Sequence, residues 1–206
     1  MKQIPAHFFE EKKLWSNGIK HVAGVDEVGR GSWAGPVVAA AVIFPKEVNF
    51  PEELYDSKLI LPRHRERLAK LIYEHSISVG IGTVGVAVIN KIGISRATQK
   101  AFRKALNLLS VAPERILIDA FYIKHLSREN QTPIKKGDQV SATIAAASIV
   151  AKVHRDSLMR KLGRVYPEYR FGVHKGYGTL AHQEAIRKYN FCKLHRKSFN
   201  LYYLTQ

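Results

Sequence analysis

Residues 22–45 read VAGVDEVGRGSWAGPVVAAAVIFP, two apolar runs separated by a glycine-rich turn. The runs at 22–25 and 37–44 are rich in valine and small residues, a composition that favours β-strands. The pattern therefore predicts a hairpin, with Asp26 and Glu27 at the end of its first strand. Taken alone, such an acidic pair is more often part of an ordinary turn. Two adjacent carboxylates beside a buried strand repel each other and are poorly solvated, so we expect a cation next to them.

The composition indicates one domain with a polyanionic partner. A chain of 206 residues with 46% hydrophobic residues is long enough to bury one good core. Its formal charge of +16 indicates a polyanionic partner, for which nucleic acid is the first candidate and an acidic membrane surface the second. A basic protein without a nucleic-acid role is the open alternative, since charge does not distinguish a nuclease from a binding protein.

The single cysteine, Cys192, excludes an intrachain disulfide and a thiolate zinc cluster, and it favours a reducing compartment. No apolar run has the length of a transmembrane span, and Glu10 and Glu11 stand where a signal peptide needs its apolar core. We therefore expect a cytoplasmic protein with no membrane contact. The nine histidines lack the spacing of zinc-protease motifs, so we interpret them mostly as surface or phosphate-proximal groups.

Two helices alternate with two further strands after the hairpin. Apolar periodicity predicts helices at 61–76 and 94–109, and apolar runs predict strands at 77–89 and 114–120. The first three strands would form an antiparallel meander. The fourth strand follows a crossover helix, so we expect it to run parallel to an earlier strand of the same sheet.

Acidic residues near the strand ends form a candidate site. Asp119 ends the fourth strand, and ligand sites in such sheets lie at the carboxyl ends of the strands. If the first and fourth strands are neighbours, the carboxylates of Asp26 and Asp119 converge. Asp138 precedes a small-residue helix that Ser141 could cap, and alone it would be a simple helix-start residue. Asp156, several turns along that helix, is interpreted as an ion-pairing surface residue.

Three other segments complete the chain. Residues 1–20 have a weak helical pattern that places Phe8 and Trp15 on one face, typical of a short leader packed on the domain. Residues 121–136 are polar and basic and predict a surface excursion. Residues 179–188 predict a helix within a carboxyl third where basic residues alternate with aromatic ones, a pattern that suits a nucleic-acid backbone.

Six separated blocks resemble the type 2 ribonucleases H, and in particular bacterial-type ribonuclease HII. They are DEVGRGSWAGPVVAAAVI at 26–43, Asp-Ser-Lys at 56–58, Leu-Ile-Asp at 117–119, KKGDQVSATIAAASIVAKVHRD at 135–156, FGVHKGYGT at 171–179 and HRKSF at 195–199. The chain departs from the family pattern at Leu59, where a second lysine is usual, at Ala120, where glycine is usual, and at the unusual pair Ser32 and Trp33.

The resemblance implies an α/β ribonuclease H-like fold, with a mixed five-stranded sheet flanked by helices and a helical C-terminal extension. It divides the chain into the leader at 1–20 and a type 2 catalytic domain at 21–206. It also implies that four carboxylates hold one or two divalent metals: Asp26, Glu27, Asp119 and Asp138. Hard carboxylate oxygens without thiolates favour Mg²⁺ or Mn²⁺ over zinc.

The resemblance further implies substrate contacts. In the family the turn at Gly29, Arg30 and Gly31 senses the 2′-hydroxyl of a ribonucleotide. Lys58 would contact a phosphate, although a solvated lysine before a helix is an equally good interpretation. Tyr177 would pack on the sugar beside the scissile position, the alternative being a loop aromatic that covers the core.

The expected activity is metal-dependent hydrolysis of the RNA strand of RNA:DNA hybrids. It includes cutting 5′ of single ribonucleotides embedded in duplex DNA, leaving 5′-phosphate and 3′-hydroxyl ends, which implies a role in ribonucleotide removal and DNA repair. Two alternatives stay open: a ribonuclease HIII-like hybrid nuclease and a catalytically inactive duplex-binding module. We expect nucleic acid as the partner and a monomer as the working form.

Overall fold

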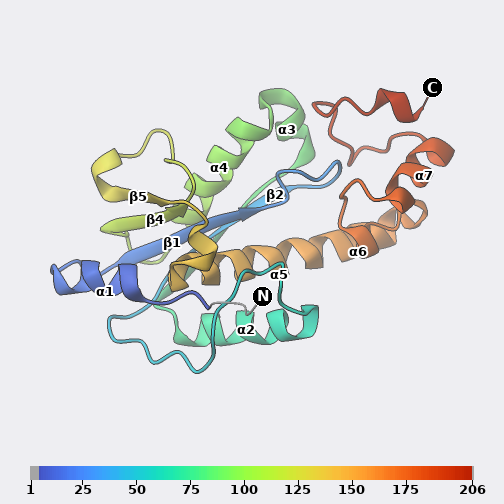
Figure 1. Ribbon diagram of the computed structural model, residues 1–206. Helices are drawn as coiled ribbons and strands as arrows, with labels where there is room; N and C mark the ends of the chain where they lie inside the picture. The colour runs from blue at the N-terminus through green and yellow to red at the C-terminus, as the bar shows by residue number, and fades with distance from the viewer. Residues whose placement is uncertain (1–4, 206) are drawn as a thin grey trace.

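The computed structural model describes residues 5–205 and shows one mixed sheet with helices on both faces (Figure 1). The strands are β1 (Val22–Val28), β2 (Val37–Ile43), β3 (Ser78–Val84), β4 (Arg115–Asp119) and β5 (Gln131–Ile134). The α-helices are α1 (Phe9–Ser16), α2 (Pro62–His75), α3 (Val86–Ile92), α4 (Ile94–Asn107), α5 (Ala142–Val165), α6 (Phe171–His174) and α7 (Leu180–Tyr189). Short 3-10 helices are η1 (Arg128–Asn130), η2 (Gly137–Gln139), η3 (Pro167–Tyr169) and η4 (Tyr202–Leu204).

The sheet has the strand order β3-β2-β1-β4-β5. The predicted meander is confirmed, because β1 pairs antiparallel with β2, and β2 pairs antiparallel with β3. The prediction that the fourth strand runs parallel to an earlier strand is also confirmed: β4 pairs with β1, with Val25 opposite Ile118. Asp26 and Asp119 each follow one residue later, so both carboxylates reach the same edge of the sheet.

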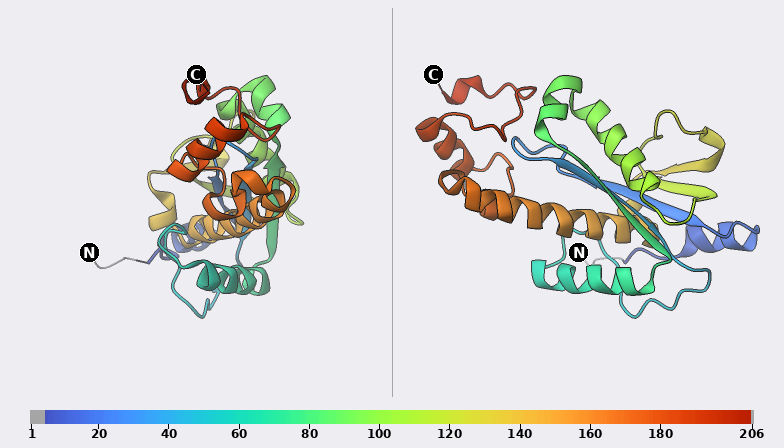
Figure 2. Two further views of the ribbon diagram at one scale, coloured as in Figure 1. Left: turned by 90° about the vertical axis from the view of Figure 1, so that its right-hand side faces the viewer. Right: turned by 180° about the vertical axis from the view of Figure 1, so that it is seen from behind.

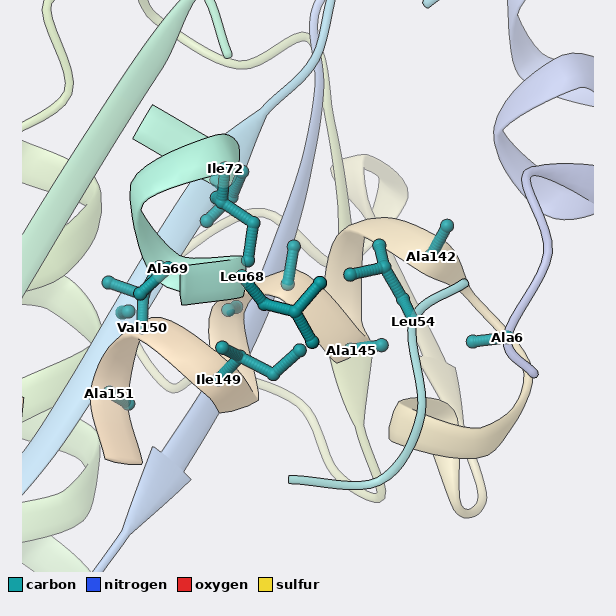
Figure 3. Close-up of a cluster of buried hydrophobic side chains, with 14 of the residues drawn as sticks. Ala6, Leu54, Leu68, Ala69, Ile72, Ala142, Ala145, Ile149, Val150 and Ala151 are labelled. Carbon is teal, nitrogen blue, oxygen red and sulfur yellow. The ribbon is translucent and has the colours of Figure 1, made fainter. Parts of the chain in front are cut away.

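Helix α5 is the central element of one face, and α2 packs outside it (Figure 2). The first half of α5 is rich in alanine, so its backbone lies close to β1 and β2. Figure 3 shows Leu68 and Ile72 of α2 packed among Ala145, Ile149 and other buried side chains of α5. Helices α3 and α4 cover the opposite face, and this two-faced burial explains the nearly continuous apolar sequences of β1 and β2.

Two sequence-based assignments are wrong. The strand predicted at 77–89 ends at Val84, and after Gly85 the chain forms α3, since short apolar runs suit either structure. The surface excursion predicted at 121–136 contains β5, which pairs parallel with β4. Pro133 is compatible with β5 because this strand lies at the edge of the sheet.

The amino-terminal segment packs on the start of α5, as expected for the leader. Phe8 stacks on Trp15 with ring centroids 6.0 Å apart. Glu11 is fully buried and accepts hydrogen bonds from the Ser141 hydroxyl at 2.5 Å and from the Thr143 backbone N–H at 2.9 Å. Ser141 caps α5 as predicted, accepting from the Ile144 N–H. The domain division at residue 20 stays a prediction.

Across residues 5–205, no helix is both long enough and apolar enough to cross a lipid bilayer.

Candidate active site

The four predicted carboxylates line one cleft of about 410 Å³ at the carboxyl ends of β1 and β4. β1 supplies Asp26 and Glu27, β4 supplies Asp119, and η2 supplies Asp138. Lys58 and Tyr177, two of the predicted substrate contacts, line the same cleft. The structure thus brings together residues that are up to 151 positions apart in the chain.

Asp26 and Glu27 are the most constrained of the acidic groups. Burial raises the pKa of Asp26 well above its usual value, and the charges of Glu27 and Asp119 raise it further, while hydrogen bonding from Ser148 lowers it. Burial also raises the pKa of Glu27, and the nearby Arg30 partly offsets that effect. Arg30 Nη1 lies 3.3 Å from Glu27 Oε1. The expectation of a cation beside this pair is therefore met in part by Arg30.

Asp119 and Asp138 are linked through the backbone of η2. The Gly137 N–H donates a hydrogen bond of 2.8 Å to Asp119 Oδ1, which fastens η2 to the end of β4. Burial raises the pKa of Asp138, and the charges of Asp56 and Asp119 add to the rise, whereas Lys58 lowers it. Ala120, at the family's glycine position, has a φ of 67°, a left-handed conformation that glycine adopts more easily.

The donor set fits a divalent cation. Carboxylates crowded enough to raise one another's pKa gain most from a hard cation among them. Among residues 5–205, no three acidic, histidine or cysteine side chains already surround one point closely enough to form a ready-made ion site. Glu27 instead pairs with Arg30, so it would have to leave this ion pair to bind a cation.

Lys58 sits on the basic side of the cleft. Although burial acts to lower its pKa, the charges of Asp56, Asp138, Asp26 and Asp119 outweigh burial and raise it. The lysine is therefore cationic among the carboxylates, and its contact with a phosphate stays a prediction.

The sequence did not single out four further residues of this cleft: Ser57, Arg65, Ser148 and Lys152. Ser148 was detectable as an isolated polar residue on the alanine face of α5. Asp156 forms ion pairs with Lys152 at 2.8 Å and with Arg65 at 3.4 Å, so its ion-pairing role is confirmed. Its predicted surface position is wrong, because it is only 9% exposed.

The turn at residues 29–31 follows β1, and Gly29, Arg30 and Gly31 are not among the residues that line the cleft. Its two glycines differ. Gly29 has a φ of 90°, and a Cβ atom there would lie 2.1 Å from Arg155 Nε, so the protein interior excludes any side chain. A Cβ at Gly31 would have nothing within 4 Å, which leaves its outer side open. Arg30 lies over the Phe121 ring, 5.0 Å from its centroid. Of the three residues, Gly31 offers the freest approach to a ligand.

Three of the nine histidines form a buried cluster and are exceptions to the prediction that the histidines lie mostly at the surface. His174 and His182 stack with centroids 4.5 Å apart, and His195 lies against His182. The Cys192 N–H donates to His195 Nδ1 at 2.9 Å, so His195 Nε2 is the donor in its 3.1 Å bond to His182 Nε2. His182 Nδ1 then donates to the Tyr177 carbonyl at 2.9 Å. This chain of bonds needs both rings neutral and ends at a residue of the cleft.

Acid is expected to destabilise the protein through this cluster. Burial lowers the pKa values of His182 and His195 to about 4. Between pH ~6.5 and 4, both histidines therefore stay neutral in the folded protein, whereas the same side chains bind protons in the unfolded chain. The stabilising contribution is therefore complete above pH ~6.5 and is lost as the pH falls towards 4. Each histidine should lower the free energy of unfolding by up to about 1.4 kcal/mol per pH unit within this window.

Urea unfolding between pH 7 and 5 measures this slope. His182→Asn should flatten it, because one titrating group is removed. His125→Asn is the matched control, since His125 is exposed and its left-handed backbone suits asparagine. Equal slopes in the wild type and in His182→Asn would contradict the prediction.

Comparisons with known proteins give the family. The ribonuclease HII family model matches residues 23–202. Ribonuclease HII of Caldanaerobacter subterraneus subsp. tengcongensis is 47% identical over 199 residues, which cover 97% of this chain and 82% of the relative. Ribonuclease HII of Bacillus cytotoxicus is 49% identical over 189 residues, which cover 92% of this chain and 72% of the relative.

Solved structures agree on the fold. Ribonuclease H2 from Pyrococcus horikoshii OT3 superposes with a TM-score of 0.71 at 24% identity, covering 88% of this chain and 94% of that one. Bst-RNase HIII in complex with Mn²⁺ gives a TM-score of 0.69 at 20% identity, covering 90% of this chain and 68% of that one. The expected ribonuclease H-like fold is thus confirmed, and the family match along most of its length means that the chain belongs to the ribonuclease HII family.

Proposed function

We propose that this protein is a metal-dependent endoribonuclease that hydrolyses the RNA strand of RNA:DNA hybrids and cuts 5′ of single ribonucleotides in duplex DNA. The products would carry 5′-phosphate and 3′-hydroxyl ends. The observation that carries the proposal is the convergence of Asp26, Glu27, Asp119 and Asp138 in one cleft of a ribonuclease HII family member. The formal charge of +16 supports a polyanionic substrate.

The four carboxylates would hold one or two Mg²⁺ or Mn²⁺ ions through their oxygens. A divalent ion bound there lowers the pKa of an attacking water and stabilises the leaving 3′ oxygen. The Glu27 N–H donates to Asp26 Oδ1 at 2.7 Å and the Gly137 N–H donates to Asp119 Oδ1 at 2.8 Å, and the second oxygen of each carboxylate would bind the cation. Lys58 would neutralise a phosphate oxygen beside them.

Substrate selection would come from the turn at residues 29–31, which follows β1, and from Tyr177. The open side of Gly31 lets the backbone approach a ribose, where a 2′-hydroxyl distinguishes RNA from DNA. Tyr177 would pack against the sugar next to the scissile phosphate. The proposed working form is a monomer.

Incubation with a DNA duplex that contains one ribonucleotide tests the proposal. The expected result is a cut immediately 5′ of the ribonucleotide, dependent on Mg²⁺ or Mn²⁺, with a 3′-hydroxyl and a 5′-phosphate at the new ends. Cutting restricted to longer RNA tracts would favour ribonuclease HIII-like specificity. Tight duplex binding with no product in either metal would favour the inactive binding module.

A further inference from the structure

Two arginines lie fully inside the protein beneath the loop at residues 29–36. Arg155 of α5 is 0% exposed, and Arg196 of the C-terminal segment is 1% exposed. Side chains with a full charge are almost never buried this deeply unless they are paired. Within residues 5–205, neither guanidinium lies within ion-pair distance of a carboxylate. Their position needs another explanation than charge pairing.

Both side chains donate their hydrogen bonds to the loop itself. Arg155 donates from Nε to the Pro36 carbonyl at 2.9 Å, and from Nη2 to the Ser32 hydroxyl at 2.7 Å and to the Ala34 carbonyl at 3.3 Å. Arg196 donates from Nη1 to the Arg30 carbonyl at 2.8 Å. It also donates from Nε and Nη2 to the Gly35 carbonyl at 3.0 and 2.9 Å. The two guanidinium groups thus bind oxygen acceptors along almost the whole loop from its buried side.

The arginines also set the beginning of the loop. Arg155 Nε occupies the space next to Gly29 where a side chain would otherwise lie. The Ser32 hydroxyl donates to the Gly29 carbonyl at 2.9 Å and accepts from Arg155. It therefore links the Gly29 backbone to the buried guanidinium of Arg155. The unusual residue Ser32 is therefore a connecting part of this arrangement.

The same arrangement fixes Tyr177 relative to the loop. The Gly176 carbonyl accepts hydrogen bonds from the Trp33 N–H at 2.8 Å and the Ala34 N–H at 3.2 Å. The Arg155 guanidinium lies 5.5 Å from the centroid of the Tyr177 ring. The 2′-hydroxyl-sensing turn and the sugar-packing tyrosine therefore form one unit around Arg155.

Arginine is costly in this position, and no other residue replaces it. Burial lowers the pKa of Arg196 to about 9, a value that still leaves the side chain charged at neutral pH. Lysine keeps the charge, but a single ammonium lacks the planar fork that reaches several carbonyl oxygens in fixed directions. An apolar residue would leave the buried carbonyl groups without donors.

We propose that Arg155 and Arg196 are positioning residues that hold the 29–36 loop at the spacing from Tyr177 needed to align the ribonucleotide for cleavage. This inference rests on the proposed function of the cleft. Neither arginine lines the cleft, so both act through the loop rather than on the substrate.

The lysine variants Arg155→Lys and Arg196→Lys test the inference on the duplex with one ribonucleotide, at a temperature where circular dichroism shows them folded. A misplacement of about 1 Å costs up to about 100-fold in rate, so we expect kcat to fall about 10- to 100-fold while KM changes less than about threefold. Arg160→Lys is the matched control on α5, because Arg160 is half-exposed and pairs with Glu66 at the surface. It should keep the wild-type kcat.

The outcomes separate the two proposals. A wild-type protein that cuts nothing overturns the proposed function, and this inference with it. Wild-type cutting combined with unchanged kcat in both lysine variants overturns this inference alone. So does a loss of activity that matches the unfolded fraction of each variant. If a lysine variant does not fold, Ser32→Ala decides by the same kcat criterion, because it removes the hydroxyl contact and leaves both arginines in place.

Discussion

Asp119→Asn is expected to abolish cleavage under Mg²⁺ while the protein stays folded and binds duplex. Asparagine keeps the size of the side chain and an oxygen that accepts the 2.8 Å hydrogen bond from Gly137, so η2 should stay attached to β4. The substitution removes one negative charge from the proposed metal-binding set. Loss of several kcal/mol of transition-state stabilisation corresponds to a rate at least about 10³-fold lower.

Single-turnover cleavage and fluorescence anisotropy measure the two parts of this prediction. The dissociation constant should stay within about threefold of the wild type, because basic side chains along the backbone supply most of the affinity. Glu114→Gln is the matched control. Glu114 directly precedes the first residue of β4, at the end of the strand away from the cleft, and its carboxylate accepts hydrogen bonds from the backbone N–H groups of Lys20 and His21. Normal turnover by Asp119→Asn would remove Asp119 from the active site.

The central part of the fold was predictable because local patterns and simple topology rules agreed there. The glycine-rich turn between two apolar runs predicted the β1–β2 hairpin, and the crossover rule predicted that β4 runs parallel to an earlier strand, which is β1. Together they placed Asp26 and Asp119 at one edge. Burial of β1 and β2 on both faces follows from the same continuous apolar sequences.

Segments whose structure depends on distant contacts were not predictable. β5 forms next to β4 after a loop that the Gln131 side chain fastens by bonding to the backbone of Ile123, Leu126 and Ser127. Nothing in the local pattern of 121–136 indicates those partners. The strand predicted at 77–89 failed for another reason, because Val86 and Ile89 bury equally well on a helix as on a strand.

In the candidate site, too, the residues that local patterns mark were predictable, and those placed by distant contacts were not. Its carboxylates were found from strand ends and from the family motif, whereas Ser148, Lys152 and Arg65 reach the cleft only because α2 and α5 pack side by side. The three buried histidines could not be told apart from the six others, because their spacing along the chain carries no sign of burial. His182 and His195 meet only when α7 folds back on the C-terminal segment.

Gly24→Ala is expected to destabilise the protein strongly, because Gly24 is where α5 comes closest to β1. A Cβ atom on Gly24 would lie 2.1 Å from the Thr143 carbonyl carbon and 2.4 Å from the Ile144 nitrogen. Both are backbone atoms in the first turn of α5, so no side-chain rotation relieves the clash. Overpacking of this kind costs about 3 kcal/mol or more. For a chain of this size the melting temperature should fall by about 6–12 °C.

The same substitution should also slow cleavage in molecules that remain folded. Gly24 and Asp26 lie two positions apart on β1 and so face α5 together. A shift of α5 away from β1 therefore moves Ser148 away from Asp26, beside which it lines the cleft and whose pKa it lowers. We expect kcat at low temperature to fall at least about tenfold, since small displacements of a catalytic group are costly.

Gly85→Ala is the control for stability, because a Cβ atom at Gly85 would have nothing within 4 Å and its backbone is in an ordinary extended conformation. Its melting temperature should change by less than about 2 °C. A Gly24→Ala protein with wild-type stability would mean that α5 and β1 are less tightly packed than the structure places them. A strongly destabilised protein with wild-type kcat at low temperature would instead show that the position of Ser148 beside Asp26 is not needed for the reaction, and that close packing at Gly24 serves the fold alone.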